Sequence, residues 1–187
     1  MEPWQRLSSR DIIRDRWVRL RADRCRLPSG QIIDPYYVME EGEWVHVFAT
    51  DARQNVLLVR QYRYAANVTG YELPGGNTVP GEDLLAAIQR EFLEETGCVA
   101  EDWRTLAAFH ANPARQDNRV HLFLATNARI VAPQKLDDTE AITVEFVPPA
   151  RVLELIRDGG ISQATHIGLI YTAFAALGWL SPTPPAG

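Results

Sequence analysis

The spacing of apolar residues predicts one amphipathic helix in the middle of the chain. No Gly or Pro occurs between positions 82 and 96, and Leu85, Ile88 and Phe92 recur at intervals of three and four residues. These intervals match the helical repeat, so the pattern predicts a helix over 82–96 with these three side chains facing the core. Gly97 follows at once and is expected to end the helix.

Short apolar runs separated by turn residues predict strands before this helix. Residues 16–27 and 31–39 read as strands, and the Leu-Pro-Ser-Gly sequence between them is a natural turn, so an N-terminal β-hairpin is expected. The stretches 45–50 and 56–62 are predicted to be buried strands, and a shorter strand is expected to end at Leu73.

The part of the chain after the helix completes the expected architecture. Strands are predicted at 103–111, 119–126 and 141–147, and helices at 149–158 and 163–179. Strands on both sides of a central helix, with more helix at the end, indicate an α+β fold. We expect an N-terminal β subdomain at 1–42, a main domain at 43–180 and a disordered tail at the Pro-rich end, 181–187.

Composition restricts the class of protein. With 187 residues, of which 46% are hydrophobic, the chain is long enough to bury a substantial core. The net charge of −5 argues against a general nucleic-acid binder. The most apolar tract, 167–180, is broken by Gly168 and Gly178 and is shorter than the roughly 18 residues of a membrane span, so no membrane partner is expected.

Cysteine and histidine usage give two further expectations. Cys25 and Cys98 cannot form a multi-bridge framework, and the polar start of the chain has no apolar signal region, so a cytoplasmic location is expected. No pair of histidines has metal-ligand spacing. The four that we expect in the core or at its rim are His46, His110, His121 and His166.

Three carboxylates occupy one sector of the predicted helix. At about 100° per residue, Glu91 and Glu95 lie one turn apart on the same face, with Glu94 beside them. Mg²⁺ prefers one or two carboxylates completed by water and phosphate oxygens, so this face suits a site that cleaves a diphosphate. Gly75 and Gly76 allow tight backbone geometry beside a ligand. The alternative is a solvated acidic face, since exposed like charges one turn apart cost only about 0.2–0.5 kcal/mol.

A longer pattern favours the metal site over the solvated face. Gly76 is followed after five residues by Glu82, and after seven more by Arg90-Glu91-x-x-Glu94-Glu95-x-Gly97. This pattern resembles the signature of the Nudix hydrolase family. The segments 56–64 and 71–76, together with the helix, resemble the ADP-ribose pyrophosphatase branch of that family, and the likeness covers about residues 16–178.

A proline beyond the motif bears on the substrate. In that branch a proline typically stands about sixteen residues after the closing glycine, and Pro113 stands at this place after Gly97. The turn here is Asn-Pro-Ala, whereas the branch commonly has a Ser-Pro-Gly-like turn. This departure keeps another nucleoside diphosphate sugar, such as GDP-mannose, open as the substrate.

The resemblance implies a fold, an assembly and a reaction. The implied fold is an α/β/α sandwich with a mixed sheet and an N-terminal β-hairpin subdomain. The implied assembly is a homodimer in which the N-terminal strands cross to the partner and help to build its substrate pocket. The implied reaction is hydrolysis of the diphosphate bond of a nucleoside diphosphate sugar, here ADP-ribose to AMP and ribose 5-phosphate. A nucleotide-sugar sensor without turnover is the alternative, and the intact glutamates argue against it.

The resemblance also assigns the metal ligands. Glu91 and Glu95 are implied as the main Mg²⁺ ligands, with Glu94 nearby, and Mn²⁺ is the alternative ion. The carbonyl of Gly75 is implied as a further ligand. Arg90 is expected to pair with a glutamate and fix its rotamer.

A loop acid is implied as the base that activates water. The branch supplies this glutamate from a loop before a late strand, and Glu140 is the candidate here. Asp137 and Asp138 compete for the role. The alternative is that all three are ordinary solvated loop acids.

Arginines and aromatic residues are the expected substrate contacts. The resemblance places Arg63 near the diphosphate or the terminal ribose, and Arg60 in the same strand is a second candidate. Arg115, in the loop after Pro113, is a candidate for the phosphate oxygens, with a solvated charge as the alternative. Four aromatic residues are candidates to stack on a nucleobase across the dimer, with core packing as the alternative: Trp17, Tyr36, Tyr37 and Trp44.

Overall fold

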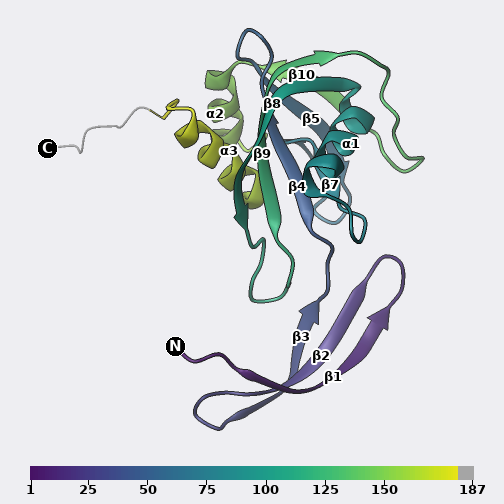
Figure 1. Ribbon diagram of the computed structural model, residues 1–187, viewed down its shortest axis with the longest axis vertical. Helices are drawn as coiled ribbons and strands as arrows, with labels where there is room; N and C mark the ends of the chain where they lie inside the picture. The colour runs from purple at the N-terminus through teal and green to yellow at the C-terminus, as the bar shows by residue number, and fades with distance from the viewer. Residues whose placement is uncertain (181–187) are drawn as a thin grey trace, which may run out of the picture. The chain divides into compact units, whose positions relative to one another are not determined.

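The computed structural model describes residues 1–180, so the predicted tail at 181–187 lies outside the described residues (Figure 1). Contacts within the chain divide it into two units. The first comprises Met1–Glu43 and Phe109–Val120, and the second comprises Trp44–Ala108 and the chain from His121 onward. The sequence placed a boundary after residue 42 and did not group 109–120 with the first unit.

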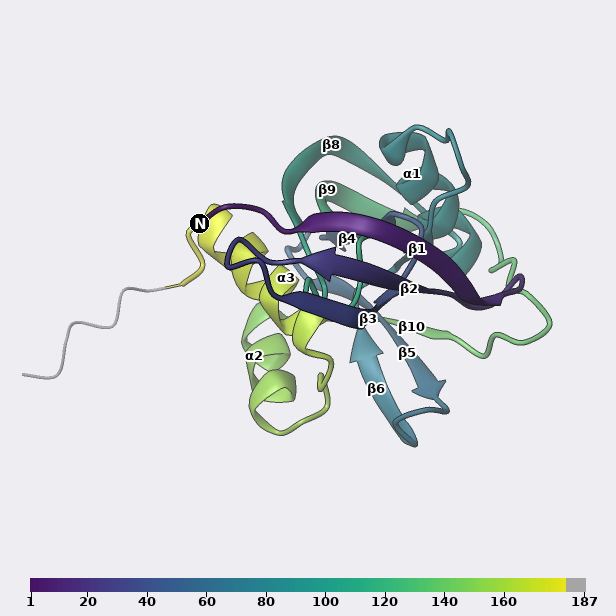
Figure 2. The same ribbon diagram turned by 90° about the horizontal axis from the view of Figure 1, so that it is seen from below.

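The first unit is built on an antiparallel sheet with strand order β1-β2-β3 (Figure 2). The strands are β1 (Gln5–Arg14), β2 (Arg19–Arg26) and β3 (Ile32–Met39). β2 and β3 form the predicted hairpin, and in its turn the Gly30 N–H donates to the Leu27 carbonyl at 2.9 Å. β1 was not predicted, because nearly all of its residues are exposed and the strand therefore carries no apolar alternation.

Polar contacts join the loop segment 109–120 to the strands of the first unit. The guanidinium of Arg21 in β2 lies 2.9 Å from the carboxylate of Asp117, and it also pairs with Asp23 and Glu40. The hydroxyl of Tyr36 donates to the carbonyl of Ala114 at 2.7 Å. These bonds hold the turn that carries Pro113 against the first unit's own sheet.

The second unit contains two sheets and three helices. One sheet has the order β10-β5-β6, and the other has the order β7-β4-β9-β8. The strands are β4 (Trp44–Ala49), β5 (Val56–Arg63), β6 (Val68–Glu72), β7 (Gly75–Asn77), β8 (Cys98–Phe109), β9 (Val120–Ile130) and β10 (Thr143–Val147). The helices are α1 (Leu84–Thr96), α2 (Pro149–Arg157) and α3 (Ala164–Ala176).

Helices cover both faces of the strands in the second unit. Both views place α1 on one side of β4 and place α2 and α3 on the other (Figures 1 and 2). The α+β class predicted from the sequence is therefore confirmed. No helix within residues 1–180 is long and apolar enough to cross a membrane.

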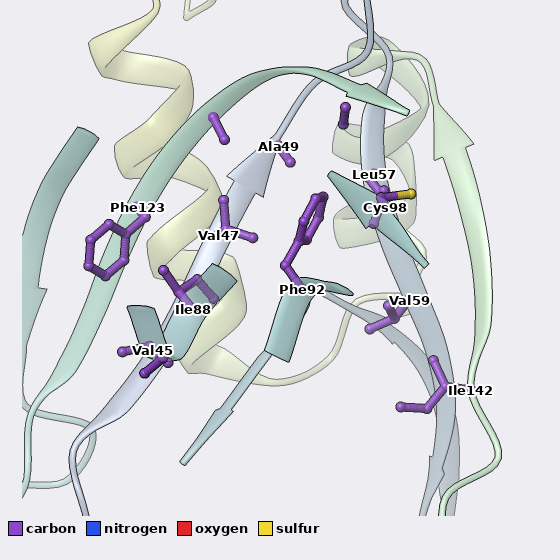
Figure 3. Packing of buried hydrophobic residues seen from close by; sticks show 13 residues of the cluster. Val45, Val47, Ala49, Leu57, Val59, Ile88, Phe92, Cys98, Phe123 and Ile142 are labelled. Atoms are coloured by element: carbon purple, nitrogen blue, oxygen red, sulfur yellow. The ribbon is translucent and has the colours of Figure 1, made fainter. Parts of the chain in front are cut away.

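The main core lies between α1 and the strands. Val45 and Val47 of β4 pack with Ile88 and Phe92 of α1, and all four are essentially inaccessible to solvent (Figure 3). Leu57 and Val59 of β5 and Phe123 of β9 extend this cluster. On the other face of β4, the ring of Phe48 meets the ring of Phe174 from α3 edge-on, with centroids 5.7 Å apart. Both faces of β4 are thus buried, as predicted for its apolar run.

Helix α1 begins two residues later than predicted. The side chain of Asp83 caps it by accepting the N–H groups of Leu85 and Ala86, and Gly97 ends it in the left-handed conformation with φ 66°.

The predicted core stripe of α1 is wrong at one position. Leu85 is 37% exposed, whereas Leu84 packs against the core with Ile88 and Phe92. Adjacent helical residues differ by about 100°, so Leu84 and Leu85 cannot both point inward. Glu95 is buried on the same inner face. The carboxylate therefore lies within the core stripe and not only at its border.

The glycine segment is a strand as well as a turn. Gly75 pairs with His46, and Gly76 pairs with Val45, in the antiparallel ladder between β7 and β4. The sequence predicted no strand between Leu73 and the helix, because glycines lack side chains and weaken any strand pattern. The ladder holds the backbone of both glycines against β4.

Candidate active site

Two glycines allow backbone and carboxylate to approach each other closely. A Cβ atom added at Gly76 would lie 2.7 Å from the carboxyl carbon of Glu91. Gly75 has φ 149°, and a Cβ atom there would overlap the carbonyl oxygen of Val45. Side chains rarely adopt this backbone conformation, so position 75 requires glycine, while a side chain at position 76 would displace the Glu91 carboxylate. The result is that α1 presents Glu91 directly against the β7 backbone.

Glu95 joins α1 to the same strand. Its side chain is 7% exposed, and its carboxylate accepts the N–H of Gly75 at 2.8 Å. Burial raises the pKa of Glu95 to about 8, and the negative charges of Glu91 and Glu140 add to this effect, while the hydrogen bond from Gly75 opposes it. The carboxylate is therefore held in place without a nearby positive charge sufficient to stabilise its ionised form.

Arg90 organises the remaining glutamates of the helix. Its guanidinium contacts Glu82 at 2.9 Å, Glu91 at 2.8 Å and Glu94 at 3.2 Å. The predicted pairing of Arg90 with a glutamate is therefore present, and it involves three of them. Burial raises the pKa of Glu91 even though the hydrogen bond from Arg90 opposes the shift. Arg90 thus orders the carboxylates but does not neutralise the whole cluster.

The donor set suits a hard cation that retains open positions. Within residues 1–180, no three His, Cys, Asp or Glu side chains converge closely enough to hold an ion by themselves. Mg²⁺ usually takes only one or two protein carboxylates and completes its shell with water and substrate phosphate oxygens. Glu91 and Glu95, two carboxylates with raised pKa that α1 presents to the Gly75-Gly76 backbone, match that requirement.

Glu140 lies on a turn within electrostatic reach of these carboxylates. Its carboxylate accepts the N–H of Asp137 at 3.0 Å, and its own N–H donates to the Asp137 carbonyl at 2.9 Å. The charge of Glu140 is among the main causes that raise the pKa values of Glu91 and Glu95, and the charges of Asp137 and Asp138 are not. The side chain is exposed and so is open to water.

Arg63 lies beside the same cluster, held by a residue that the sequence did not single out. Its Nε and Nη2 donate to the two carboxylate oxygens of Glu72 at 2.9 and 2.6 Å. The charges of Glu95 and Glu140 are among the causes that raise the pKa of Arg63, after the hydrogen bond that Arg63 donates to Glu72. The side chain remains 52% exposed and lines a hollow of about 330 Å³ with Gly70 and Ser162.

Arg60 does not face the cluster of Arg63 and the metal glutamates. Successive residues of a strand point to opposite faces, so Arg60 and Arg63 lie on opposite faces of β5. The guanidinium of Arg60 lies over the ring of Tyr71, 5.7 Å from its centroid. Trp44, the first residue of β4, is half-buried and pairs with Asn77 in the ladder to β7.

The predicted loop contacts lie in the first unit. Pro113 and Arg115 belong to a turn closed by the bond from the Arg115 N–H to the Asn112 carbonyl at 2.9 Å. Arg115, Tyr37 and Met39 line a hollow of about 590 Å³. Trp17 is 74% exposed, and Arg16 lies over its ring at 4.4 Å.

Sequence reasoning missed the buried partners of Arg63. Glu72 is 5% exposed in its side chain, and burial alone would disfavour its ionised form. Hydrogen bonds from Arg63 and His166 outweigh burial and lower the pKa of Glu72 to about 2. A lone carboxylate directly before Leu-Pro-Gly-Gly was the available signal.

The histidines lie as expected: His46, His121 and His166 are buried, and His110 is exposed at the rim.

Comparison with known proteins agrees with this geometry. The family model for the NUDIX domain matches residues 42–165, and the model for the nucleoside diphosphate sugar hydrolase N-terminal domain matches residues 4–39. The chain is 31% identical over 168 residues to an ADP-ribose pyrophosphatase of Mycobacterium tuberculosis, covering 88% of this chain and 81% of that protein.

Two further similarities concern the substrate range and the fold. The chain is 28% identical over 168 residues to a CMP-5'-(N-acetyl-N-hydroxy-3-aminopropyl)phosphonate hydrolase of Streptomyces rubellomurinus, covering 89% of this chain and 81% of that protein. The crystal structure of an ADP compounds hydrolase superposes with a TM-score of 0.84 at 19% identity, covering 96% of each chain. This similarity supports the predicted arrangement of a mixed sheet with helices.

Proposed function

Because this chain belongs to the Nudix hydrolase family, we propose that it hydrolyses the diphosphate bond of a nucleoside diphosphate sugar, with ADP-ribose as the preferred substrate. The products are AMP and ribose 5-phosphate. The observation that carries the proposal is the contact of Glu95 with the Gly75 backbone beside Glu91, because it brings a buried carboxylate that has no ion pair within residues 1–180 next to a second, half-buried carboxylate.

The metal is assigned to these two carboxylates. Glu91 and Glu95 would hold Mg²⁺, with Mn²⁺ as the alternative ion, Glu94 nearby and the carbonyl of Gly75 as a further ligand. Such an ion would supply positive charge to the diphosphate oxygens and lower the pKa of a bound water. Arg90 contributes by keeping Glu91 and Glu94 in fixed rotamers through its ion pairs.

Proton transfer is assigned to Glu140. A general base must reach the attacking water, and this carboxylate is exposed, within electrostatic reach of the metal glutamates and bonded to its own turn. Its influence on the pKa values of both Glu91 and Glu95 distinguishes it from Asp137 and Asp138.

Arg63 is assigned to the substrate phosphate or terminal ribose. It is half exposed, its guanidinium is oriented by Glu72, and it lies within electrostatic reach of Glu95 and Glu140. A guanidinium fixed on one edge by a carboxylate still presents donors on its other edge, which suits an anionic oxygen.

The identity of the substrate rests on similarity to relatives. The ADP-ribose pyrophosphatase of Mycobacterium tuberculosis supports ADP-ribose. A second candidate is a CMP-linked compound, because the Streptomyces hydrolase covers the chain equally well. In both cases the chemistry is the same and only the base and the leaving half differ.

The first unit is assigned to dimerisation and to the nucleobase. This unit exposes apolar side chains, among them Ile12, Trp17 and Tyr37, which favours burial against a second copy. Both cysteines are free and buried, which suits the proposed cytoplasmic location. Light scattering at micromolar concentration tests the assembly, and a fully active monomer would contradict it.

A product screen tests the proposed reaction. The full-length protein is incubated with Mg²⁺ or Mn²⁺ and, separately, with ADP-ribose, GDP-mannose, CMP-linked substrates and nucleoside triphosphates, and the products are separated by chromatography. We expect AMP and ribose 5-phosphate from ADP-ribose at the highest kcat/KM. Faster cleavage of another nucleoside diphosphate compound overturns the substrate assignment, and tight binding without any product makes the chain a sensor.

A further inference from the structure

A chain of polar side chains runs from the half-exposed Arg63 into the interior of the second unit. Arg63 pairs with both oxygens of Glu72, and Oε2 of Glu72 lies 3.4 Å from Nε2 of His166. The ring of His166 meets the ring of His46 edge-on, with centroids 4.8 Å apart. His46 stands opposite Gly75 in the ladder between β4 and β7. This chain therefore links the substrate arginine to the strand of the metal site.

The bonding of His166 fixes which ring nitrogen carries the proton. Nδ1 lies 3.1 Å from the backbone nitrogen of Leu73, and a backbone N–H can only donate, so Nδ1 must accept. The neutral ring then carries its proton on Nε2, the atom that faces Glu72. With 1% exposure, the ring has no solvent to replace either partner.

Each nitrogen of His166 acts on a different part of the site. Through Nε2, it supports the carboxylate that orients Arg63. Through Nδ1, it holds Leu73 at the point where the chain leaves β6 for Gly75. The next residue, Pro74, is held by its carbonyl, which accepts the Val47 N–H at 3.1 Å. The N–H of the following residue, Gly75, donates to Glu95.

We propose that His166 is a positioning residue with two separable effects, setting the Arg63 guanidinium through Glu72 and the Gly75 strand of the metal site through Leu73. The inference rests on the proposed function, since that function assigns Arg63 to the substrate and Gly75 with Glu95 to the metal. Residues that support ligands from behind a site typically change affinity or activity by about 10–100-fold when they are replaced.

Two substitutions separate the two effects. In His166→Asn, the amide oxygen takes the place of Nδ1 and still accepts the Leu73 N–H, but residue 166 no longer donates to Glu72, which keeps only Arg63 and Gln61 as donors. We expect KM for ADP-ribose to rise about tenfold, with kcat and the Mn²⁺ affinity of the substrate-free protein within about twofold of wild type.

The second substitution reverses the pattern. In His166→Gln, the amide nitrogen takes the place of Nε2 and still donates to Glu72, but the acceptor for Leu73 is lost. We expect kcat and Mn²⁺ affinity to fall about tenfold, with KM within about twofold of wild type. Mn²⁺ affinity is measured by electron paramagnetic resonance without substrate, so one readout is independent of turnover.

A core substitution in the same helix is the control. Leu169 is 1% exposed in α3, and Leu169→Met changes packing without removing a polar contact. We expect a shift in melting temperature with KM, kcat and Mn²⁺ affinity all within about twofold of wild type.

The outcomes distinguish failure of the inference from failure of the proposed function. If His166→Asn and His166→Gln change KM, kcat and Mn²⁺ affinity in the same proportions, or lower only the melting temperature as Leu169→Met does, His166 is an ordinary core residue. If the wild type prefers another nucleoside diphosphate compound, the same split is expected with that substrate. A wild type that neither binds Mn²⁺ nor turns over any substrate overturns the proposed function and the inference together.

Discussion

Glu72 and Glu95 are both buried carboxylates in the second unit, yet their ionisation differs widely. Glu72 is 4% exposed and Glu95 is 7% exposed. Burial opposes ionisation of both, but Arg63 and His166 bring the pKa of Glu72 down to about 2, whereas the pKa of Glu95 is raised to about 8. The difference shows that burial does not set the charge state alone, and that the nearest charges decide it.

The two carboxylates differ in whether the chain itself balances their charge. Glu72 receives donors from Arg63, Gln61 and His166, so its charge is balanced within the chain. Glu95 receives one backbone N–H and faces two other negative charges. A carboxylate so placed gains most from a cation that arrives with the substrate, which is the behaviour expected of a metal ligand.

The largest expected effect comes from replacing Glu140, the loop carboxylate whose charge raises the pKa of Glu95. Glu140→Gln should lower kcat by about 10²–10⁴-fold and leave KM nearly unchanged, because a general base acts only in the chemical step. Steady-state kinetics on the best substrate measures this. Asp137→Asn and Asp138→Asn serve as controls and should be milder. A larger loss in either aspartate variant would move the base to that residue.

The next effect concerns Glu95 itself. Glu95→Gln keeps the shape and an acceptor for the Gly75 N–H but removes a ligand charge, so turnover should fall by on the order of 10²-fold or more. The metal-free protein should stay as stable as wild type, because a neutral amide replaces a carboxylate that burial disfavours. Glu154→Gln, in an exposed ion pair of α2, is the matched control. Wild-type turnover in Glu95→Gln would remove this residue from the metal site.

Sequence alone predicted the glutamates of the metal site, because they lie in one continuous segment. Glu91, Glu94 and Glu95 share a helix, and a helical repeat places them without knowledge of the rest of the fold. The error at Leu85 arose because two adjacent leucines fit the same repeat and only packing distinguishes them.

The surroundings of Glu72, including His166, could not be predicted in this way, because they depend on contacts between distant segments. Leu73 and His166 are 93 residues apart, and nothing in either segment's pattern reveals that they meet. Strand β1 was missed for a related reason: its side chains are exposed, and its pairing with β2 comes from backbone hydrogen bonds, which leave little trace in an apolar pattern.

A smaller effect is expected at Glu72, and it falls on stability. Glu72→Gln removes a charge whose pKa is lowered from 4.5 to about 2, so the free energy of unfolding at pH 7 should fall by about 3 kcal/mol. Urea denaturation measures this. Glu101→Gln breaks an exposed ion pair with Arg129 and should cost less than about 1 kcal/mol. Equal losses in the two variants would mean that burial adds nothing to the Glu72 pair.

The pH dependence of the Glu72 effect has a definite sign. A pKa that is lower in the folded state gives stability that is present above the unfolded pKa and is lost as the pH falls through the folded pKa. The gap between wild type and Glu72→Gln should therefore be full above about pH 4.5 and should narrow as the pH falls toward 2. A gap that stays constant over this range would contradict an ionised Glu72.

The smallest effect separates the charged donor from the neutral donor at the same carboxylate. Gln61 donates its amide to Oε2 of Glu72 at 3.2 Å, whereas Arg63 binds both carboxylate oxygens. Gln61→Ala removes one neutral hydrogen bond and should lower the free energy of unfolding by about 1 kcal/mol, measured by urea denaturation beside Glu72→Gln. Gln89→Ala, at an exposed position of α1, is the control. If Gln61→Ala cost as much as Glu72→Gln, the low pKa of Glu72 would depend on its hydrogen-bond count and not on the charge of Arg63.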